Sequence, residues 1–456
     1  MMGVFMPLFG TDGVRGVVND TLTVALATRL ARTVGSRLGP GARVVVGRDT
    51  RVSGPLLEAA SMAGLLEVGV QAVSVGVVPT PAVAFLVPAL GADAGLVISA
   101  SHNAPEYNGL KWLARDGRKF SEEEEAAVAS AYDEDRPDRV PPAQIGSVNR
   151  WPEAVEQYQS YLVSVFAGQI PPLNVVVDLG HGAASRTVVS VLERLGCRVS
   201  VLFGEPHGHL INVGCGATHP EQVADAVRRG GFDVGLTFDG DADRVMAADA
   251  DGHILNGDAI LLVLARALAA QNRLAGRRVI ATVMSNLGLE RALHADGIAL
   301  ERTQVGDRYV AARMVETGST LGGEQSGHVI LSDWSVTGDG LLTALALLRE
   351  MHRTGEPLAH LTTGFVTYPQ VLTNVKLGQI PAGWDENPAV IEALNLARQA
   401  LGEEGRVVVR PSGTEPLLRI MLEGRDEGQI HEWADRLAAV VQEALGSATA
   451  PSESAR

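Results

Sequence analysis

The stretch Val-Val-Val-Gly-Arg-Asp at residues 44–49 places a continuous β-branched run directly before a polar turn. The same pattern returns as Val-Val-Val-Asp-Leu-Gly at residues 175–180 and as Ile-Ala-Thr-Val-Met-Ser-Asn at residues 280–286. A helical pattern follows each of the three stretches. Continuous apolar runs that lead into helices are typical of parallel strands buried between helices. The three stretches therefore predict a fold of α/β layers, with polar turns at the ends of the strands.

The length of the chain and the spacing of these stretches predict several domains. A chain of 456 residues exceeds what one hydrophobic core usually supports. We expect three related α/β domains and a smaller C-terminal α+β domain, in which strand patterns at residues 406–409 and 417–422 precede a helix from about residue 427. The expected boundaries are 1–148, 149–253, 254–368 and 369–446, with a charged, proline-rich linker at 134–142 and a tail, 447–456, that is expected to be disordered.

Composition and charge exclude several classes of function. The net charge of −15 argues against a general affinity for nucleic acid. The longest apolar stretch, residues 260–268, is interrupted by Arg266 and is too short to span a bilayer. The N-terminal residues do not read as a signal peptide, and Cys197 and Cys215 lack the spacing of a metal site or a disulfide framework. We therefore expect a soluble cytoplasmic protein with no membrane partner and with ordinary thiols.

A candidate nucleophile follows the apolar run at residues 94–98. The sequence Ser-Ala-Ser-His-Asn at residues 99–103 puts Ser101 just beyond a predicted strand end, where ligands collect in α/β folds. A serine hydroxyl is a weak nucleophile unless a base or a metal ion activates it. Side chains of adjacent residues in an extended chain point apart, so a simple pair between Ser101 and His102 is not expected. On its own, this segment could equally be a polar turn.

Three aspartates alternate on the loop after the predicted strand at residues 233–237. Asp239, Asp241 and Asp243 lie two residues apart and are followed by Arg244. Carboxylates this close converge on a hard divalent cation more readily than they tolerate one another unpaired. The loop lacks the bidentate glutamate of an EF-hand, and its small intervening residues leave room for a phosphate, as Mg²⁺ usually prefers. The alternative is an acidic turn capped by Arg244.

Further polar loops offer groups for a phosphorylated sugar. Residues 322–328, Gly-Gly-Glu-Gln-Ser-Gly-His, present a carboxylate, a hydroxyl and an imidazole to sugar hydroxyls or an amine. Residues 410–416, Arg-Pro-Ser-Gly-Thr-Glu-Pro, with Arg419 close behind, form a nest for phosphate from backbone amides, two hydroxyls and an arginine. Residues 9–16 put Arg15 on a turn near the start of the chain. A nucleophile, a metal cage, a sugar loop and a phosphate nest together fit phosphoryl transfer to a substrate that already carries one phosphate.

These motifs, in this order, resemble those of the α-D-phosphohexomutases. The resemblance runs from residue 9 to about residue 424 and rests on residues 10–16, 99–111, 239–244, 324–328 and 410–416. Residues 211–220, 284–288 and 305–309, with Gln325, resemble the branch of the family that acts on glucosamine phosphates. Two stretches depart from the family pattern: Ala104 stands before Pro105 in the serine loop, and His-Gly-His-Leu fills residues 207–210.

The resemblance implies four domains around a central cleft and a mechanism through a phosphorylated enzyme. Phosphorylated Ser101 would give its phosphate to glucosamine 6-phosphate. The resulting 1,6-bisphosphate would return its other phosphate to Ser101 and leave glucosamine 1-phosphate for the synthesis of UDP-N-acetylglucosamine and cell-wall precursors. A hexose 1,6-bisphosphate would also act as activator. Mg²⁺ would be held by Asp239, Asp241, Asp243 and the Ser101 phosphate.

The resemblance also implies roles for the other motif residues. Glu324 and Ser326 would hold the sugar hydroxyls. The unreacting phosphate would be held by Arg410, Ser412, Gly413, Thr414 and Arg419. The family positions for charge-stabilising or acid–base groups are occupied by Arg15, Lys111, Arg244 and His328.

Other interpretations remain open. A phosphomannomutase or phosphoglucomutase would carry out the same chemistry on a hydroxyl-bearing sugar. A metal-dependent sugar phosphatase would not need a separate phosphate nest, and a catalytically silent sugar-phosphate binder would lack Ser101 or an aspartate of the cage. We expect a small-molecule phosphosugar as the partner of a monomer or homodimer.

Overall fold

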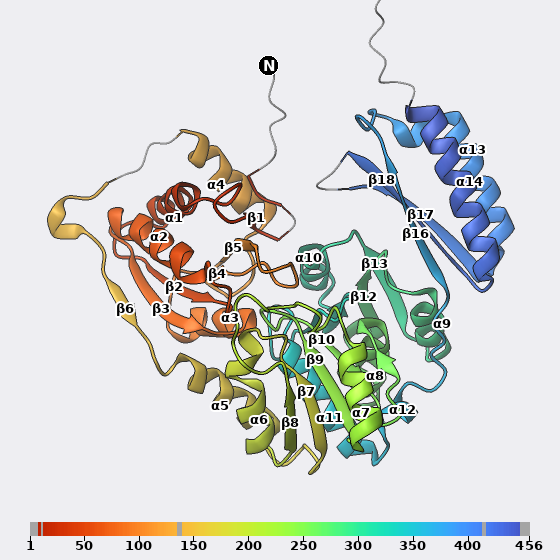
Figure 1. The fold of residues 1–456 in the computed structure, drawn as a ribbon, viewed down its shortest axis with the longest axis horizontal. Coiled ribbons are helices and arrows are strands. Elements are labelled where there is room, and N and C mark those ends of the chain that lie inside the picture. Colours follow the sequence, from red (N-terminus) through yellow and green to blue (C-terminus); the bar gives the residue numbers. More distant parts are fainter. Residues whose placement is uncertain (1–7, 11, 135–138, 413–415, 447–456) are drawn as a thin grey trace, which may run out of the picture. The chain divides into compact units, whose positions relative to one another are not determined.

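The structure is a computed structural model that describes residues 8–10, 12–134, 139–412 and 416–446. The chain divides into two compact units, Met1–Met284 with Asp296–Thr363, and Ser285–Ala295 with Gly364–Arg456. The first unit contains three sheets and the second contains one (Figure 1). The expected fold class, three α/β domains followed by a smaller C-terminal domain, is confirmed.

The first sheet has six strands in the order β1-β5-β4-β2-β3-β6. The predicted strand at residues 44–46 is part of β2, whose valines are fully buried and which pairs in parallel with β3 and β4. The hydrophobic core of this first domain forms where Leu30 and Leu57, from two helices, pack against Leu96 of β4. The strands are β1 Val14–Val17, β2 Arg43–Arg48, β3 Gln71–Val77, β4 Ala94–Ile98, β5 Tyr107–Leu113 and β6 Val148–Arg150. The helices are α1 Val24–Leu38, α2 Gly54–Glu67, α3 Thr80–Ala89 and α4 Glu122–Glu134.

The second sheet has five strands in the order β11-β10-β9-β7-β8. The predicted strand at residues 175–177 is part of β7, which pairs in parallel with β8 and β9, so the carboxyl ends of these strands share one edge. The strands are β7 Asn174–Asp178, β8 Arg198–Leu202, β9 Val234–Phe238, β10 Val245–Ala248 and β11 Ile254–Leu255. The helices are α5 Ala154–Phe166, α6 Val188–Arg194 and α7 Glu221–Gly230.

The third sheet has four strands in the order β13-β12-β14-β15. The predicted strand near residues 280–283 is β12, which pairs in parallel with β13 and β14, whereas β14 and β15 form an antiparallel pair around the predicted sugar loop. The strands are β12 Arg278–Thr282, β13 Ala299–Thr303, β14 Leu321–Gly323 and β15 Val329–Leu331. The helices are α8 Gly257–Ala270, α10 Asp307–Thr317, α11 Gly340–Thr354 and α12 Leu358–Leu361.

The second unit is a three-stranded antiparallel sheet with helices. Strand order is β16-β18-β17, and the predicted strands and helix at its end are confirmed as β17, β18 and α14. Its core packs Val390 and Leu437 of two helices against Ile420 of β18. The elements are α9 Leu287–Ala295, β16 Gln370–Lys376, α13 Pro388–Leu401, β17 Gly405–Pro411, β18 Leu417–Gly424 and α14 Glu427–Gly446.

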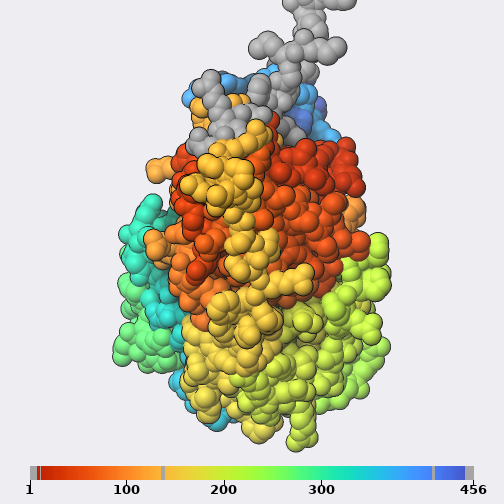
Figure 2. Space-filling view, turned by 90° about the vertical axis from the view of Figure 1, so that its left-hand side faces the viewer, coloured from red at the N-terminus to blue at the C-terminus, as the bar shows by residue number. Residues whose placement is uncertain are grey.

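Several elements lie at or across the expected domain boundaries. Strand β6 adds residues 148–150 to the first sheet, and β11 adds residues 254–255 to the second. Residues 285–295, expected in the third domain, group with the C-terminal unit. Figure 2 shows the connecting segment after residue 139, in yellow-orange, lying across the surface of the first domain toward the second. The predicted tail, 447–456, lies outside the described residues, and the boundaries themselves stay predictions.

None of the helices in the described part of the chain is long and apolar enough for a membrane span. Cys197 and Cys215 are both buried and unpaired in a disulfide, as expected.

Candidate active site

Ser101 lies in a buried turn that directly follows the carboxyl end of β4. Its residue is 1% exposed, and its backbone has a φ of 51°, in the left-handed region that few non-glycine residues adopt. The Oγ atom donates a hydrogen bond of 2.6 Å to Oδ2 of Asp239, on the loop that follows β9. The ends of two strands from different sheets thus bring the predicted nucleophile into contact with the predicted metal cage.

The relation between Ser101 and His102 differs from the expectation. Nδ1 of His102 lies 3.3 Å from Ser101 Oγ, whereas an extended chain would point the two side chains apart. The physical reason is the left-handed turn at Ser101, which brings the neighbouring side chains to one side. Burial, together with Arg244 and Arg15, lowers the pKa of His102 to about 4, so its ring is neutral at pH 7.

Asp239, Asp241 and Asp243 form a buried cluster. Each offers one oxygen, and these oxygens lie within 4.8 Å of one another. Burial raises the pKa of Asp239 well above its ordinary value, and the two neighbouring carboxylates raise it further. Within the described residues, Oδ1 of Asp241 and Oδ1 of Asp243 are buried without a hydrogen-bond partner. Orphaned carboxylate oxygens of this kind fit a hard divalent cation, so the cluster could hold a metal ion.

Lys111, on β5, supplies a buried cation to this cluster. Its Nζ lies 2.8 Å from Oδ2 of Asp241, 3.1 Å from Oδ2 of Asp12 and 3.9 Å from Oδ2 of Asp243. Burial alone would lower the pKa of Lys111, but Asp12 and Asp241 outweigh burial and raise it. Lys111 is therefore charged at neutral pH and acts as a hydrogen-bond donor.

Three residues without a predicted role extend this charge network. Asp12 binds Lys111, Arg15 and Lys119, and Lys119 also binds Asp307 at the start of α10. Asp12 and Asp307 belong to motifs that carried the resemblance, so the sequence contained a signal for them. Lys119 lies in no such motif. Thr80 was missed as well, although its Oγ1 donates to Oδ2 of Asp241 at 2.7 Å.

Arg15 and Arg244 both lie close to the serine. Arg15, on β1, donates from Nη1 to the Ala100 carbonyl at 3.3 Å and to Oδ1 of Asn103 at 3.1 Å. Nε of Arg244 lies 3.9 Å from Oδ2 of Asp239 and 3.8 Å from Oδ1 of Asp243. That Nε atom has no hydrogen-bond partner within the described residues, although it is buried. Both guanidinium groups can therefore stabilise negative charge beside Ser101.

The sugar loop lies between β14 and β15 and borders the same site. The N–H of Gly338 donates to Nε2 of His328 at 3.1 Å, and Nδ1 of this buried ring lies 3.5 Å from Oδ2 of Asp243. Asp243 and Asp307 raise the pKa of His328 against the effect of its burial. Nε2 also lies 3.4 Å from Oδ2 of Asp307, so each ring nitrogen faces a carboxylate. His328 therefore orients a carboxylate of the cluster.

Glu324 and Ser326 have free hydrogen-bonding capacity in this loop. Burial raises the pKa of Glu324, whose Oε1 accepts a bond of 3.3 Å from the N–H of Gly306. Oγ of Ser326 is buried and, within the described part of the chain, has no hydrogen-bond partner. Both groups are suited to polar atoms of a ligand.

Two arginines of the predicted phosphate nest face each other in the C-terminal unit. Arg410 of β17 lies opposite Arg419 of β18, and no described carboxylate forms an ion pair with either. Burial and Arg419 lower the pKa of Arg410. Like charges directly opposite on two strands are destabilising, which favours an anion between them. Ser412 follows β17, whereas Gly413 and Thr414 lie outside the described residues.

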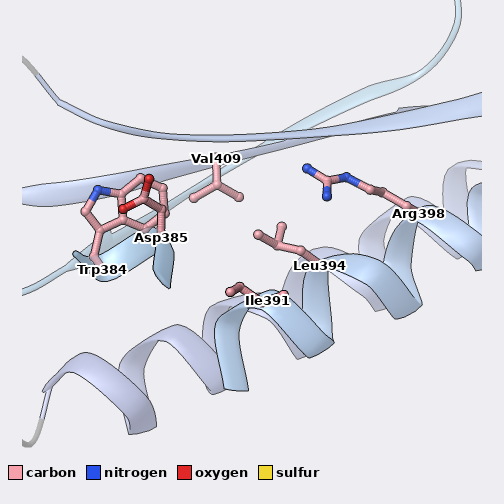
Figure 3. A pocket seen from close by; sticks show the side chains of 6 residues that line it. All are labelled: Trp384, Asp385, Ile391, Leu394, Arg398 and Val409. Carbon is pink, nitrogen blue, oxygen red and sulfur yellow. The ribbon is translucent and has the colours of Figure 1, made fainter. Parts of the chain in front are cut away.

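The same unit has a small pocket apart from these residues. Figure 3 shows that its lining side chains come from α13, from β17 and from the short helical turn at Trp384–Glu386. The cavity has a volume of about 280 Å³. It is lined by Trp384, Asp385, Ile391, Leu394, Arg398 and Val409. None of these described lining residues belongs to the predicted site.

Comparison with known families agrees with this geometry. The four domains of the phosphoglucomutase/phosphomannomutase family match in order, with α/β/α domains I, II and III at residues 6–139, 153–252 and 256–368 and the C-terminal domain at residues 372–440. The chain is 47% identical over 428 residues to the phosphoglucosamine mutase of Moorella thermoacetica, covering 93% of this chain and 96% of the relative. It is also 47% identical over 447 residues to that of Acidothermus cellulolyticus, covering 96% of both.

Solved structures show the same fold. A phosphoglucomutase/phosphomannomutase family protein from Burkholderia thailandensis has a TM-score of 0.81 and 28% identity, covering 96% of this chain and 98% of that one. The N-acetylphosphoglucosamine mutase of Aspergillus fumigatus, solved in complex with GlcNAc-6P and magnesium, has a TM-score of 0.67 and 15% identity and covers 96% of both chains. The chain therefore belongs to the phosphoglucomutase/phosphomannomutase family.

Proposed function

We propose that the protein interconverts glucosamine 6-phosphate and glucosamine 1-phosphate, with Ser101 as the phosphoryl carrier. Several relatives named phosphoglucosamine mutase are 43–47% identical to the chain and are matched over nearly their whole length. The reaction is an isomerisation of a phosphosugar, which agrees with the family to which the chain belongs.

The observation that carries this proposal is the contact between Ser101 and the aspartate cluster. Ser101 Oγ lies 2.6 Å from a carboxylate oxygen of that cluster, and two other oxygens of the cluster have no hydrogen-bond partner in the described structure. A phosphate on Ser101 would therefore lie beside the cation that the carboxylates bind. Mg²⁺, held by Asp239, Asp241 and Asp243, would supply charge stabilisation for the transferring phosphoryl group.

The transfer proceeds in two balanced steps. The O1 hydroxyl of glucosamine 6-phosphate attacks the phosphorus on Ser101, the bond from phosphorus to Oγ breaks, and glucosamine 1,6-bisphosphate results. The bisphosphate then turns over, and Ser101 Oγ attacks its 6-phosphate, which restores phosphorylated Ser101 and leaves glucosamine 1-phosphate. Each step moves one phosphoryl group and one hydroxyl proton, so there is no net consumption of phosphate.

Three cations stabilise the charge of these steps. Lys111 stays protonated between Asp12 and Asp241, and the guanidinium groups of Arg15 and Arg244 lie close to Ser101. Because the transition state of phosphoryl transfer is loose, its charge is spread over the phosphoryl oxygens, where fixed donors stabilise it most. None of the three acts as a base in this proposal.

The remaining motif residues select and hold the substrate. The Glu324 carboxylate and the Ser326 hydroxyl receive the sugar, including its amino group, in either orientation. Arg410, Arg419, Ser412, Gly413 and Thr414 hold the phosphate that does not react. The two arginines support this role because they face each other without a carboxylate partner in the described chain.

The test is isomerisation by the purified protein with Mg²⁺ and catalytic glucose 1,6-bisphosphate. We expect glucosamine 6-phosphate to be converted to its 1-phosphate isomer, and glucose and mannose 6-phosphates to compete poorly. Preference for mannose or glucose phosphate would replace the substrate but keep the chemistry. Release of free phosphate in place of an isomer would show a phosphatase.

A further inference from the structure

Arg51 is a fully buried arginine that the steps above do not use. Its Nε atom donates to Oδ2 of Asp49 at 2.9 Å, and both side chains are 0% exposed. Its other four N–H groups have acceptors among the backbone carbonyls of the serine loop. These are the carbonyls of Ser101 at 3.0 Å, Asn103 at 2.7 Å, Ala104 at 2.5 Å and Tyr107 at 2.9 Å. All five guanidinium donors are therefore used, four of them on one loop.

Asp49, the ion-pair partner of Arg51, is linked to the backbone N–H of Ser101. Oγ of Ser99 donates to Oδ2 of Asp49 at 2.7 Å and accepts the N–H of Ser101 at 2.9 Å. The ion pair of Asp49 and Arg51 is thus linked to both backbone groups of Ser101. Asp49 is linked to the N–H through the hydroxyl of Ser99, and Arg51 binds the carbonyl directly. Since Ser101 has a left-handed φ of 51°, bonds to both of its backbone groups offset the cost of that conformation.

Asn212 adds a donor from the second domain. Its Nδ2 donates to the carbonyl of Ser101 at 2.9 Å and to that of Asn103 at 3.1 Å. The metal loop approaches the same point, because a Cβ on Gly240 would lie 2.6 Å from the Ser101 carbonyl oxygen. One carbonyl oxygen is therefore enclosed by Arg51 of the first domain and by Asn212 and Gly240 of the second.

We propose that Arg51 and Asn212 are positioning residues that fix the direction of Ser101 Oγ toward the aspartate cluster. Arg51 sets the shape of the serine loop, and Asn212 ties that loop to the domain that carries the metal ligands. Neither side chain has a hydrogen bond to the Oγ atom, so both act through backbone groups of the serine loop. The expected effect on kcat rests on the proposed function, whereas the expected effect on the order of the serine loop does not.

The sharpest variant is Asn212→Gly. Asn212 has a φ of 60°, which glycine adopts without strain, so the substitution removes the amide and keeps the backbone. Misplacement of a reacting group by about 1 Å costs up to roughly 100-fold in rate. We expect kcat to fall by about 10- to 100-fold with an unchanged KM for glucosamine 6-phosphate. Backbone hydrogen exchange should rise in residues 99–107 and not in the other loops.

Matched controls separate this role from general destabilisation. Asn272→Gly changes another asparagine with a φ of 55°, in the turn after α8. Arg51→Lys should also lower kcat, because three ammonium donors cannot serve five acceptors. Arg349→Lys changes another buried arginine, which packs on Phe166 and Trp334. We expect the two control variants, Asn272→Gly and Arg349→Lys, to keep the wild-type kcat.

The outcomes are distinct. A fall in kcat for Asn212→Gly and Arg51→Lys alone, with faster exchange in residues 99–107, supports the proposal. A wild-type kcat in Asn212→Gly, a change in KM instead of kcat, or unchanged exchange in residues 99–107 overturns it. If the wild-type protein does not isomerise glucosamine 6-phosphate, the proposed function fails, and the exchange measurement still decides whether Asn212 holds the serine loop.

Discussion

Gly257, the first residue of α8, lies against the backbone of the sugar loop. Its N–H donates to the Gln325 carbonyl at 3.0 Å. A Cβ at this position would lie 1.9 Å from the Glu324 carbonyl oxygen and 2.8 Å from the N–H nitrogen of Gly327. Contacts of a Cβ below 3.0 Å essentially do not occur, so Gly257→Ala must move the start of α8 and the Glu324 carbonyl apart by about 1.1 Å, the difference between 3.0 and 1.9 Å.

This displacement should weaken catalysis through the sugar loop. A misplacement of about 1 Å costs on the order of 100-fold in rate, so we expect kcat/KM for glucosamine 6-phosphate to fall by about 100-fold. Mg²⁺ binding, measured by calorimetry, should be retained, because Gly257 does not contact the aspartate cluster.

Gly428 in α14 offers a matched control for this substitution. Gly428→Ala, in α14, places a Cβ no closer than 3.3 Å to any described atom outside its own helix turn, and it should leave kcat/KM unchanged. A folded Gly257→Ala protein with wild-type kcat/KM would show that the position of Glu324 does not limit the reaction.

Four further predictions concern the metal cluster, the charge network and the phosphate nest. Thr80→Val removes the hydroxyl that orients Asp241 and should weaken Mg²⁺ binding by about 10- to 100-fold in calorimetry, with Thr80→Ser as the variant that retains binding. Lys119→Met removes one buried cation from both Asp12 and Asp307, which keep their other partners, and should lower the free energy of unfolding in urea by up to about 3–5 kcal/mol, whereas Lys376→Met, at an exposed position of β16, should not. Burial raises the pKa of Asp339, the N-cap of α11, to about 6, above its value in the unfolded chain. This group therefore stabilises the fold at acidic pH and loses that contribution as pH rises through about 6. The free energy of unfolding of Asp339→Asn, compared with that of the wild type at pH 5 and pH 8, should lack this loss. Arg419→Gln should raise the KM for glucosamine 6-phosphate while raising the stability of the C-terminal sheet by about 0.2–1 kcal/mol, and a lower stability would contradict the repulsion between Arg410 and Arg419.

The sequence carried the fold and the main chemical groups because their signals are local. The valine runs at residues 44–46 and 175–177 predict buried strands, and the alternating aspartates predict a cation site within five residues. The two strands and the last helix of the C-terminal unit were equally readable, since apolar periodicity follows directly from secondary structure.

Other features depend on contacts that no local pattern encodes. Lys119 lies outside every motif, and only the packed fold brings it between Asp12 and Asp307. The contact of Ser101 with His102 was not expected, because a left-handed φ at a serine cannot be read from the sequence. The role of Arg51 likewise emerges only when four carbonyl groups of a distant loop converge on one guanidinium.

The proposed reaction requires that Ser101 carry the phosphoryl group between two positions of one sugar. The most direct measurement is a single turnover with protein that has been labelled by ³²P-glucose 1,6-bisphosphate and then mixed with unlabelled glucosamine 6-phosphate and Mg²⁺. We predict that the label is on Ser101 before mixing, that Ser101→Ala takes up none, and that the label then moves to glucosamine bisphosphate and monophosphate. Label on Ser101→Ala, or label released from the wild-type protein only as free phosphate, would contradict the account.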